Sequence, residues 1–199
     1  KKVHGFLKAE QAEPTPLHSL DKHAAQLGLG GIYVKDESGR LGTKAFKVSG
    51  VAWAMSSWMA QKLGIDLSKV KGGMAELRSL YEAKFPEPLT FCTCTDGNHG
   101  AAVALAAKKL GQKAVVYMPK GSADARVENV RRHGGTCTVT EMNYDDTVDF
   151  ASATADEIRA AWKKMALKVH PDKCEDDGGV AFQAVQAAYE TLRALVPPS

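Results

Sequence analysis

The sequence has no apolar run that approaches membrane-spanning length, and its first residues, KKVHGFLKAEQ, lack the hydrophobic core of a signal peptide. It also lacks a strong excess of charge, because 26 Lys and Arg residues oppose 23 Asp and Glu residues and leave a net charge of +3. So small an excess, without a localised patch, does not favour a polyanionic partner. We therefore expect neither a nucleic acid nor a membrane as partner.

Cysteine is scarce, and no two cysteines form a CxxC pair. Cys92 and Cys94 are alternate residues of an apolar run, so we expect both side chains on one face of a strand. Free thiols in a reducing compartment, the cytoplasm, fit this usage better than a disulfide set or a structural zinc site. We predict no metal site. The other two cysteines are Cys137 and Cys174.

What the sequence does contain is a regular alternation of strands and helices. Short apolar runs alternate with stretches of helical spacing, which predicts parallel βαβ units with right-handed crossovers, and so the α/β class. Ligands bind such sheets at the carboxyl ends of the strands. The predicted strands are 31–35, 89–94, 114–118 and 136–140, and the predicted helices are 17–27, 46–63, 75–85, 101–110 and 123–133.

Two segments are candidates for chemistry. Lys47, in GTKAFKVSG, opens an apolar helix, where partial burial would free its amine for imine formation; the alternative is an ordinary surface lysine. TDGNHG (95–100) follows a predicted strand and precedes a helix, so its backbone N–H groups can receive an anion. The alternative for TDGNHG is a tight turn in which Asp96 caps the helix.

Four ordered motifs, KDESGRLGTKAFKVSG, TDGNHG, VYMPKGSADARVENV and MNYDDTV, together resemble the diaminopropionate ammonia-lyase branch of the pyridoxal-phosphate enzymes. This resemblance runs from about Pro14 to about Asp156. It implies the tryptophan-synthase-β-like fold, which is fold type II of these enzymes. The implied reaction is α,β-elimination of 2,3-diaminopropionate to pyruvate and ammonia.

The resemblance also implies residue roles. Lys47 would form a Schiff base with pyridoxal phosphate, and Asn98 would hydrogen-bond the cofactor's ring hydroxyl. Thr95, Asp96 and Gly97 would contact the carboxylate of a small amino-acid substrate. Asp96 would in addition remove a proton from Cα of one substrate enantiomer.

The sequence departs from this family in two respects. The resemblance stops soon after residues 144–147, before the family's glycine-rich phosphate cradle and the partner of the pyridine nitrogen. Ala101 also stands where this branch usually has Arg. We therefore expect a truncated lyase domain, in which imine formation at Lys47 can persist while the full lyase reaction is lost.

The C-terminal part carries a second resemblance. EIRAAWKKMALKVHPDK followed by AFQAVQAAYETL resembles the J domain of DnaJ-type co-chaperones, without its first helix. By that resemblance a basic helix face would meet an acidic surface of a heat-shock chaperone ATPase, and the HPD tripeptide would couple docking to ATP hydrolysis. The residues concerned are Lys163, Lys164, Lys168, His170, Pro171 and Asp172.

These resemblances divide the chain into a lyase-like domain, residues 1–153, and a J-domain-like helical hairpin, residues 154–199. Three hypotheses follow: a pyridoxal-phosphate lyase or cofactor binder, a co-chaperone, or a gene-fusion product with neither activity. Residues 144–170 have helical character almost throughout, so we expect one helix to cross the boundary.

Overall fold

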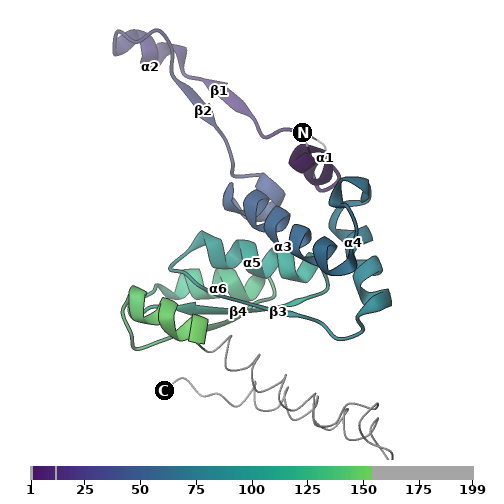
Figure 1. Ribbon diagram of the computed structural model, residues 1–199. Coiled ribbons are helices and arrows are strands. Elements are labelled where there is room, and N and C mark those ends of the chain that lie inside the picture. Colours follow the sequence, from purple (N-terminus) through teal and green to yellow (C-terminus); the bar gives the residue numbers. More distant parts are fainter. Residues whose placement is uncertain (1, 12, 154–199) are drawn as a thin grey trace, which may run out of the picture.

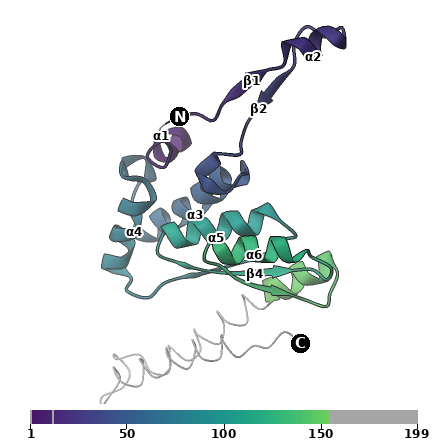
Figure 2. The same ribbon diagram turned by 180° about the vertical axis from the view of Figure 1, so that it is seen from behind.

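The structure is a computed structural model that describes residues 2–11 and 13–153, with side chains from residue 5 onward. Figures 1 and 2 show a sheet with helices stacked on one face and a narrow arm that projects away from this body. The helices are α1 (Lys2–Lys8), α2 (Asp21–Gln26), α3 (Lys47–Leu63), α4 (Gly73–Lys84), α5 (Asn98–Lys109) and α6 (Asp124–Arg132), with short 3₁₀ turns at Arg40–Gly42 and Leu67–Lys69. The strands are β1 (Leu17–Ser19), β2 (Tyr33–Lys35), β3 (Thr90–Cys94), β4 (Lys113–Met118) and β5 (Thr136–Val139).

The central sheet is parallel, in the order β3-β4-β5. In β4, Ala114, Val116 and Met118 are buried, whereas Val115 and Tyr117 between them are only half-buried. Since alternate residues of a strand point to opposite faces, the buried set faces the helices. The predicted α/β class and parallel βαβ order are confirmed.

The core lies where α5 packs between the sheet and α3 (Figure 1). Helix α5 is rich in buried alanines, which allow its backbone to approach both neighbours closely. Helix α3 supplies larger side chains, such as Met55 and Met59, and α4 adds Met74 and Leu77. The start of α3 and the start of α5 are thereby held side by side.

The arm consists of β1, α2 and β2, and it corrects one prediction. Leu17–Ser19, expected as the start of a helix, instead pairs antiparallel with Tyr33–Lys35. Strand pairing outweighs the local helical spacing there, and the helix begins only at Asp21. Helix α1 was not predicted; its Phe6 is buried and packs edge-on against Trp53 with ring centroids 6.1 Å apart.

Helix α5 also begins earlier than predicted, at Asn98 instead of residue 101. Half of the TDGNHG motif therefore belongs to the first helical turn and not to the loop. The other predicted elements agree with the structure to within two residues at each end.

Residues 144–153 are helical, as expected for the start of the long helical stretch. Thr147 is buried, and Phe150 packs edge-on against Tyr117 of β4 with ring centroids 5.1 Å apart. The predicted J-domain-like hairpin lies outside the described residues, and so do Lys163, Lys164, Lys168, His170, Pro171 and Asp172.

Two composition-based expectations can be compared with the described part of the chain. Its cysteines, Cys92, Cys94 and Cys137, are free thiols. None of its helices combines the length and the apolar character needed to cross a bilayer.

Candidate active site

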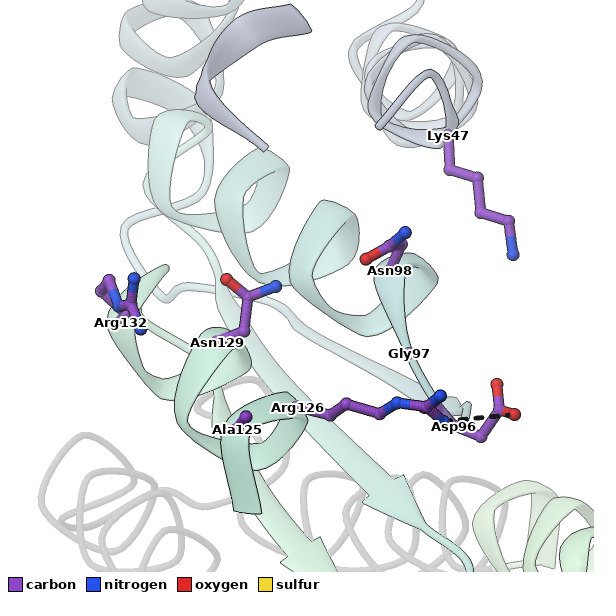
Figure 3. Close-up of a pocket in the computed structure, with 8 residues that line it drawn as sticks. All are labelled: Lys47, Asp96, Gly97, Asn98, Ala125, Arg126, Asn129 and Arg132. Atoms are coloured by element: carbon purple, nitrogen blue, oxygen red, sulfur yellow. Dashed lines mark hydrogen bonds and ion pairs between the residues drawn. The ribbon is translucent and has the colours of Figure 1, made fainter. Parts of the chain in front are cut away.

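A hollow of about 410 Å³ opens at the carboxyl end of β3, where α3, α5 and α6 converge. This is the sheet edge at which ligands bind in parallel α/β proteins. Figure 3 shows side chains from separate segments of the sequence arranged around it. The lining residues are Lys47, Asp96, Gly97, Asn98, Ala125, Arg126, Asn129 and Arg132.

Lys47 is the first residue of α3. Ala45, two residues before it, and Val48, directly after it, are buried and fix the backbone. The lysine itself is exposed, and its side chain extends away from the helix (Figure 3). The partial burial considered from the sequence is therefore absent. Its position on the hollow, and not desolvation, makes Lys47 a candidate nucleophile.

The loop after β3 is held in place mainly by hydrogen bonds of Thr95, which is buried. The Thr95 backbone N–H donates to the Tyr117 carbonyl at 3.0 Å, and the Gly97 N–H donates to Thr95 Oγ1 at 3.1 Å. Thr95 thus shapes the loop without lining the hollow. Asp96 is not a helix cap: Gly97 is the N-cap residue of α5, and no side chain caps this helix.

Asn98 and His99 form the first turn of α5. The Asn98 side chain is exposed to the hollow and makes no hydrogen bond to another residue of the described part, so its amide is free for a ligand. His99 is half-buried, and this burial, together with the nearby charge of Lys47, lowers the pKa of its imidazole. At neutral pH the lowered pKa favours the uncharged ring.

Helix α6 supplies the opposite wall of the hollow, which the sequence did not predict. Arg126, Asn129 and Arg132 are spaced three residues apart and so share one face of this helix. Figure 3 shows Arg126 extending toward Asp96, and Arg132 at the far side of the hollow from Lys47. The available signal was position: α6 follows the carboxyl end of β4, on the same sheet edge as TDGNHG.

Charge on the lining is mostly positive. Lys47, Arg126 and Arg132 face the hollow, and Asp96 is the acidic residue among the lining side chains. The Asp96 charge also contributes, after burial, to raising the pKa of the neighbouring Cys94 thiol. A hollow with this charge suits a ligand that carries anionic groups.

Comparison with known proteins identifies the family. The profile of the family described as "Pyridoxal-phosphate dependent enzyme" matches residues 9–198. The chain belongs to this family. The expectation of pyridoxal phosphate as cofactor is thereby confirmed at the level of the family.

Individual members of the family show which of its enzymes the chain is similar to. Diaminopropionate ammonia-lyase of Salmonella typhimurium is 48% identical over 141 residues, which are 71% of this chain and 34% of that protein. Biosynthetic L-threonine dehydratase of the same organism is 28% identical over 188 residues, or 94% of this chain and 31% of that protein. The crystal structure of apo diaminopropionate ammonia-lyase of Escherichia coli superposes with a TM-score of 0.72 at 42% identity, covering 78% of this chain and 41% of that one.

The chain spans about a third of the length of these curated relatives. The family match extends over most of residues 154–199 as well, so the boundary placed after residue 153 stays a prediction.

The residues around the hollow fit a pyridoxal ring. Lys47 offers a primary amine for the aldehyde, and Asn98 offers a free amide for a ring substituent. The hollow lies within the size range of small-molecule sites, roughly 300–1,000 Å³. The excess of basic side chains suits the anionic phosphate group.

Proposed function

We propose that the chain carries the part of a pyridoxal-phosphate-dependent ammonia-lyase site that contains Lys47, and that this site acts on 2,3-diaminopropionate. The observation that supports this best is that Lys47, from one motif, and Asp96 and Asn98, from another, line one hollow. The 48% identity to diaminopropionate ammonia-lyase points to the same substrate class.

In this proposal Lys47 holds the cofactor through its amine and Asn98 orients the ring. When bound, pyridoxal phosphate supplies an electron-withdrawing ring that stabilises negative charge at the substrate Cα. The loop at Asp96 and Gly97, which Thr95 holds from behind, receives the substrate carboxylate, whose charge the basic lining favours.

Asp96 then acts as general base. Its side chain is 67% exposed and reaches the hollow from the loop. Its carboxylate accepts the Cα proton of one enantiomer, and the electron pair left at Cα forms a double bond to Cβ as the amino group on Cβ leaves in its protonated form, as ammonia. Water then hydrolyses the released enamine to pyruvate and a second ammonia.

The truncation predicts loss of the full reaction, whereas the shared hollow supports turnover. The test that decides between them is an assay of pyruvate and ammonia from each enantiomer of 2,3-diaminopropionate in the presence of pyridoxal phosphate. Asp96→Asn should lose turnover of one enantiomer by about 100-fold or more, since a general base contributes 10²–10⁴-fold. Asp124→Asn, on α6 but outside the lining, is the matched control and should keep wild-type rates. Absence of pyruvate with the unaltered chain, or equal loss for both enantiomers, would contradict the proposal.

A second proposal concerns residues 154–199, and it rests on the sequence motif alone. We propose that His170 and Asp172, with the basic residues Lys163, Lys164 and Lys168, stimulate a heat-shock chaperone ATPase. His170→Gln should abolish the stimulation. His18→Gln, on the exposed β1 strand, should leave it intact. Equal stimulation by the unaltered chain and His170→Gln would reject this role.

Two further expectations stay predictions. A small amino acid as ligand follows from the proposed reaction, and a solved structure of the Escherichia coli enzyme contains D-serine. A cytoplasmic location rests on cysteine usage.

A further inference from the structure

Asp96 has one side-chain partner among the described residues, Arg126. Arg126 Nη1 donates a hydrogen bond to the Asp96 backbone carbonyl at 2.6 Å, and the same nitrogen lies 3.6 Å from Asp96 Oδ2. Figure 3 shows the Arg126 side chain extending to this aspartate. The arginine therefore holds the backbone of Asp96 as well as facing its carboxylate.

The two ends of this contact differ in rigidity. Arg126 is on α6, where the next residue, Val127, and then Val130 are buried and anchor the helix. Asp96 is in a loop whose other backbone bonds involve Thr95 and Gly97 and not Asp96 itself. Helix α6 is thus the more firmly held element, and the Arg126 bond fixes Asp96 relative to this helix.

We propose that Arg126 is a positioning residue that sets the place of the Asp96 carboxylate relative to Lys47. This proposal rests on the proposed role of Asp96 as general base. Arg126 takes no proton, because a guanidinium stays charged at all pH values relevant to proteins.

The distances indicate that Arg126 positions Asp96 and does not neutralise its carboxylate. The strong contact goes to the carbonyl, whereas the 3.6 Å separation from Oδ2 is longer than a hydrogen bond. The carboxylate oxygens therefore remain available to accept a proton while the backbone beneath them is held. A displacement of about 1 Å at such a position can lower turnover 10²-fold.

The first test is amide hydrogen exchange of the peptide that contains residues 95–98, measured on the protein without ligand. Arg126→Met should speed this exchange about threefold, a modest effect because the contact is partly exposed. Arg126→Lys keeps a charged donor and should restore slower exchange. Arg131→Met is the matched control, since Arg131 is on the same helix and donates to a different carbonyl, that of Cys137, at 3.3 Å.

The second test is steady-state kinetics with 2,3-diaminopropionate. Arg126→Met should lower kcat about 10- to 100-fold with KM nearly unchanged, and Arg126→Lys should recover part of the loss. The absorption band that the chain forms with pyridoxal phosphate should be the same in all three proteins. A rise in KM at constant kcat would instead make Arg126 a substrate-binding residue and would overturn the proposal.

The exchange measurement does not depend on turnover, so it decides the role of Arg126 even if the chain shows no lyase activity. Unchanged exchange of residues 95–98 in Arg126→Met, or an equal effect of Arg131→Met on the same peptide, would overturn the proposal.

Discussion

Gly100 lies so close to Thr95 that a Cβ atom at position 100 would come within 2.7 Å of Thr95 Cγ2. The same atom would lie 2.8 Å from Val116 Cγ1. Both distances are shorter than real contacts of Cβ atoms, so the absence of a side chain at this glycine allows α5 to start directly against β3 and β4. This close approach places Asn98 and the TDG loop at the hollow.

Gly100→Ala should therefore destabilise the protein by about 1–3 kcal/mol, the usual cost of overpacking a filled core. Urea denaturation gives the free energy of unfolding. Gly50→Ala is the control, because this α3 glycine has no atom within 4 Å of its Cβ position. There the change should stabilise the helix by up to about 1 kcal/mol. Equal effects at the two glycines would contradict the packing argument.

A buried pair of hydroxyl groups joins the helix at residues 144–153 to the sheet. Thr140 Oγ1 and Thr147 Oγ1 are 2.8 Å apart, and Thr147 Oγ1 donates to the Asn143 carbonyl at 2.6 Å. Thr147 is fully buried, so Thr147→Val removes two buried hydrogen bonds, while Thr140 Oγ1 keeps its bond to the Met118 carbonyl. We expect a loss of about 1–3 kcal/mol in the free energy of unfolding.

The control for this pair is Thr138→Val, in β5, where the hydroxyl is only half-buried and valine suits a strand. It should change stability little. If Thr140→Val and Thr147→Val act through one bond, the double variant should lose less than the sum of the single losses. Strict additivity would show that the two hydroxyl groups act independently.

The turn between the arm and α3 contains a carboxylate, Glu37, that should make the stability of the protein depend on pH. Glu37 accepts hydrogen bonds from Arg40 Nε at 2.6 Å and from Thr15 Oγ1 at 2.7 Å. These bonds, Arg40 first, lower the pKa of Glu37 from 4.5 to about 2. Because the folded pKa is the lower one, the carboxylate stabilises the fold above pH 4.5, and this contribution is lost as the pH falls toward 2.

As the pH is lowered from 6 to 2.5, the midpoint temperature of thermal unfolding should therefore fall less steeply for Glu37→Gln than for the unaltered protein. Glu128→Gln, an exposed carboxylate of α6, is the control and should keep the original pH dependence. Parallel curves for all three proteins would show that Glu37 does not contribute to acid sensitivity.

The sequence predicted the elements of the sheet because their signals are local. Apolar runs such as 114–118 and glycines at the turns mark strands and helix ends without tertiary information. Strand β1 was missed because Leu17–Ser19 is stabilised by its pairing with β2, which helical spacing cannot reveal. Helix α1 was missed because its short sequence is polar apart from a few residues such as Phe6.

About half of the residues that line the candidate site were predicted from the sequence. Lys47, Asp96, Gly97 and Asn98 belong to motifs that resemble a known family, and the structure places all four on one hollow. Most of the α6 wall also lies in one of these motifs, VYMPKGSADARVENV, but its polar residues, Arg126 among them, match an ordinary solvated helix face and were assigned no role. Only the packing of α6 beside α5 shows that this face lines the hollow.

The most direct test of the central claim is to incubate the chain with pyridoxal phosphate, reduce it with borohydride and locate the adduct by mass spectrometry. The account predicts one pyridoxyl group on the peptide that contains Lys47, together with a near-visible absorption band before reduction. Both should disappear in Lys47→Ala. Lys44→Asn should retain both, since it removes a nearby amine while tolerating the positive φ of 57° at that position. Absence of an adduct, or labelling spread over the surface lysines without preference for Lys47, would contradict the account.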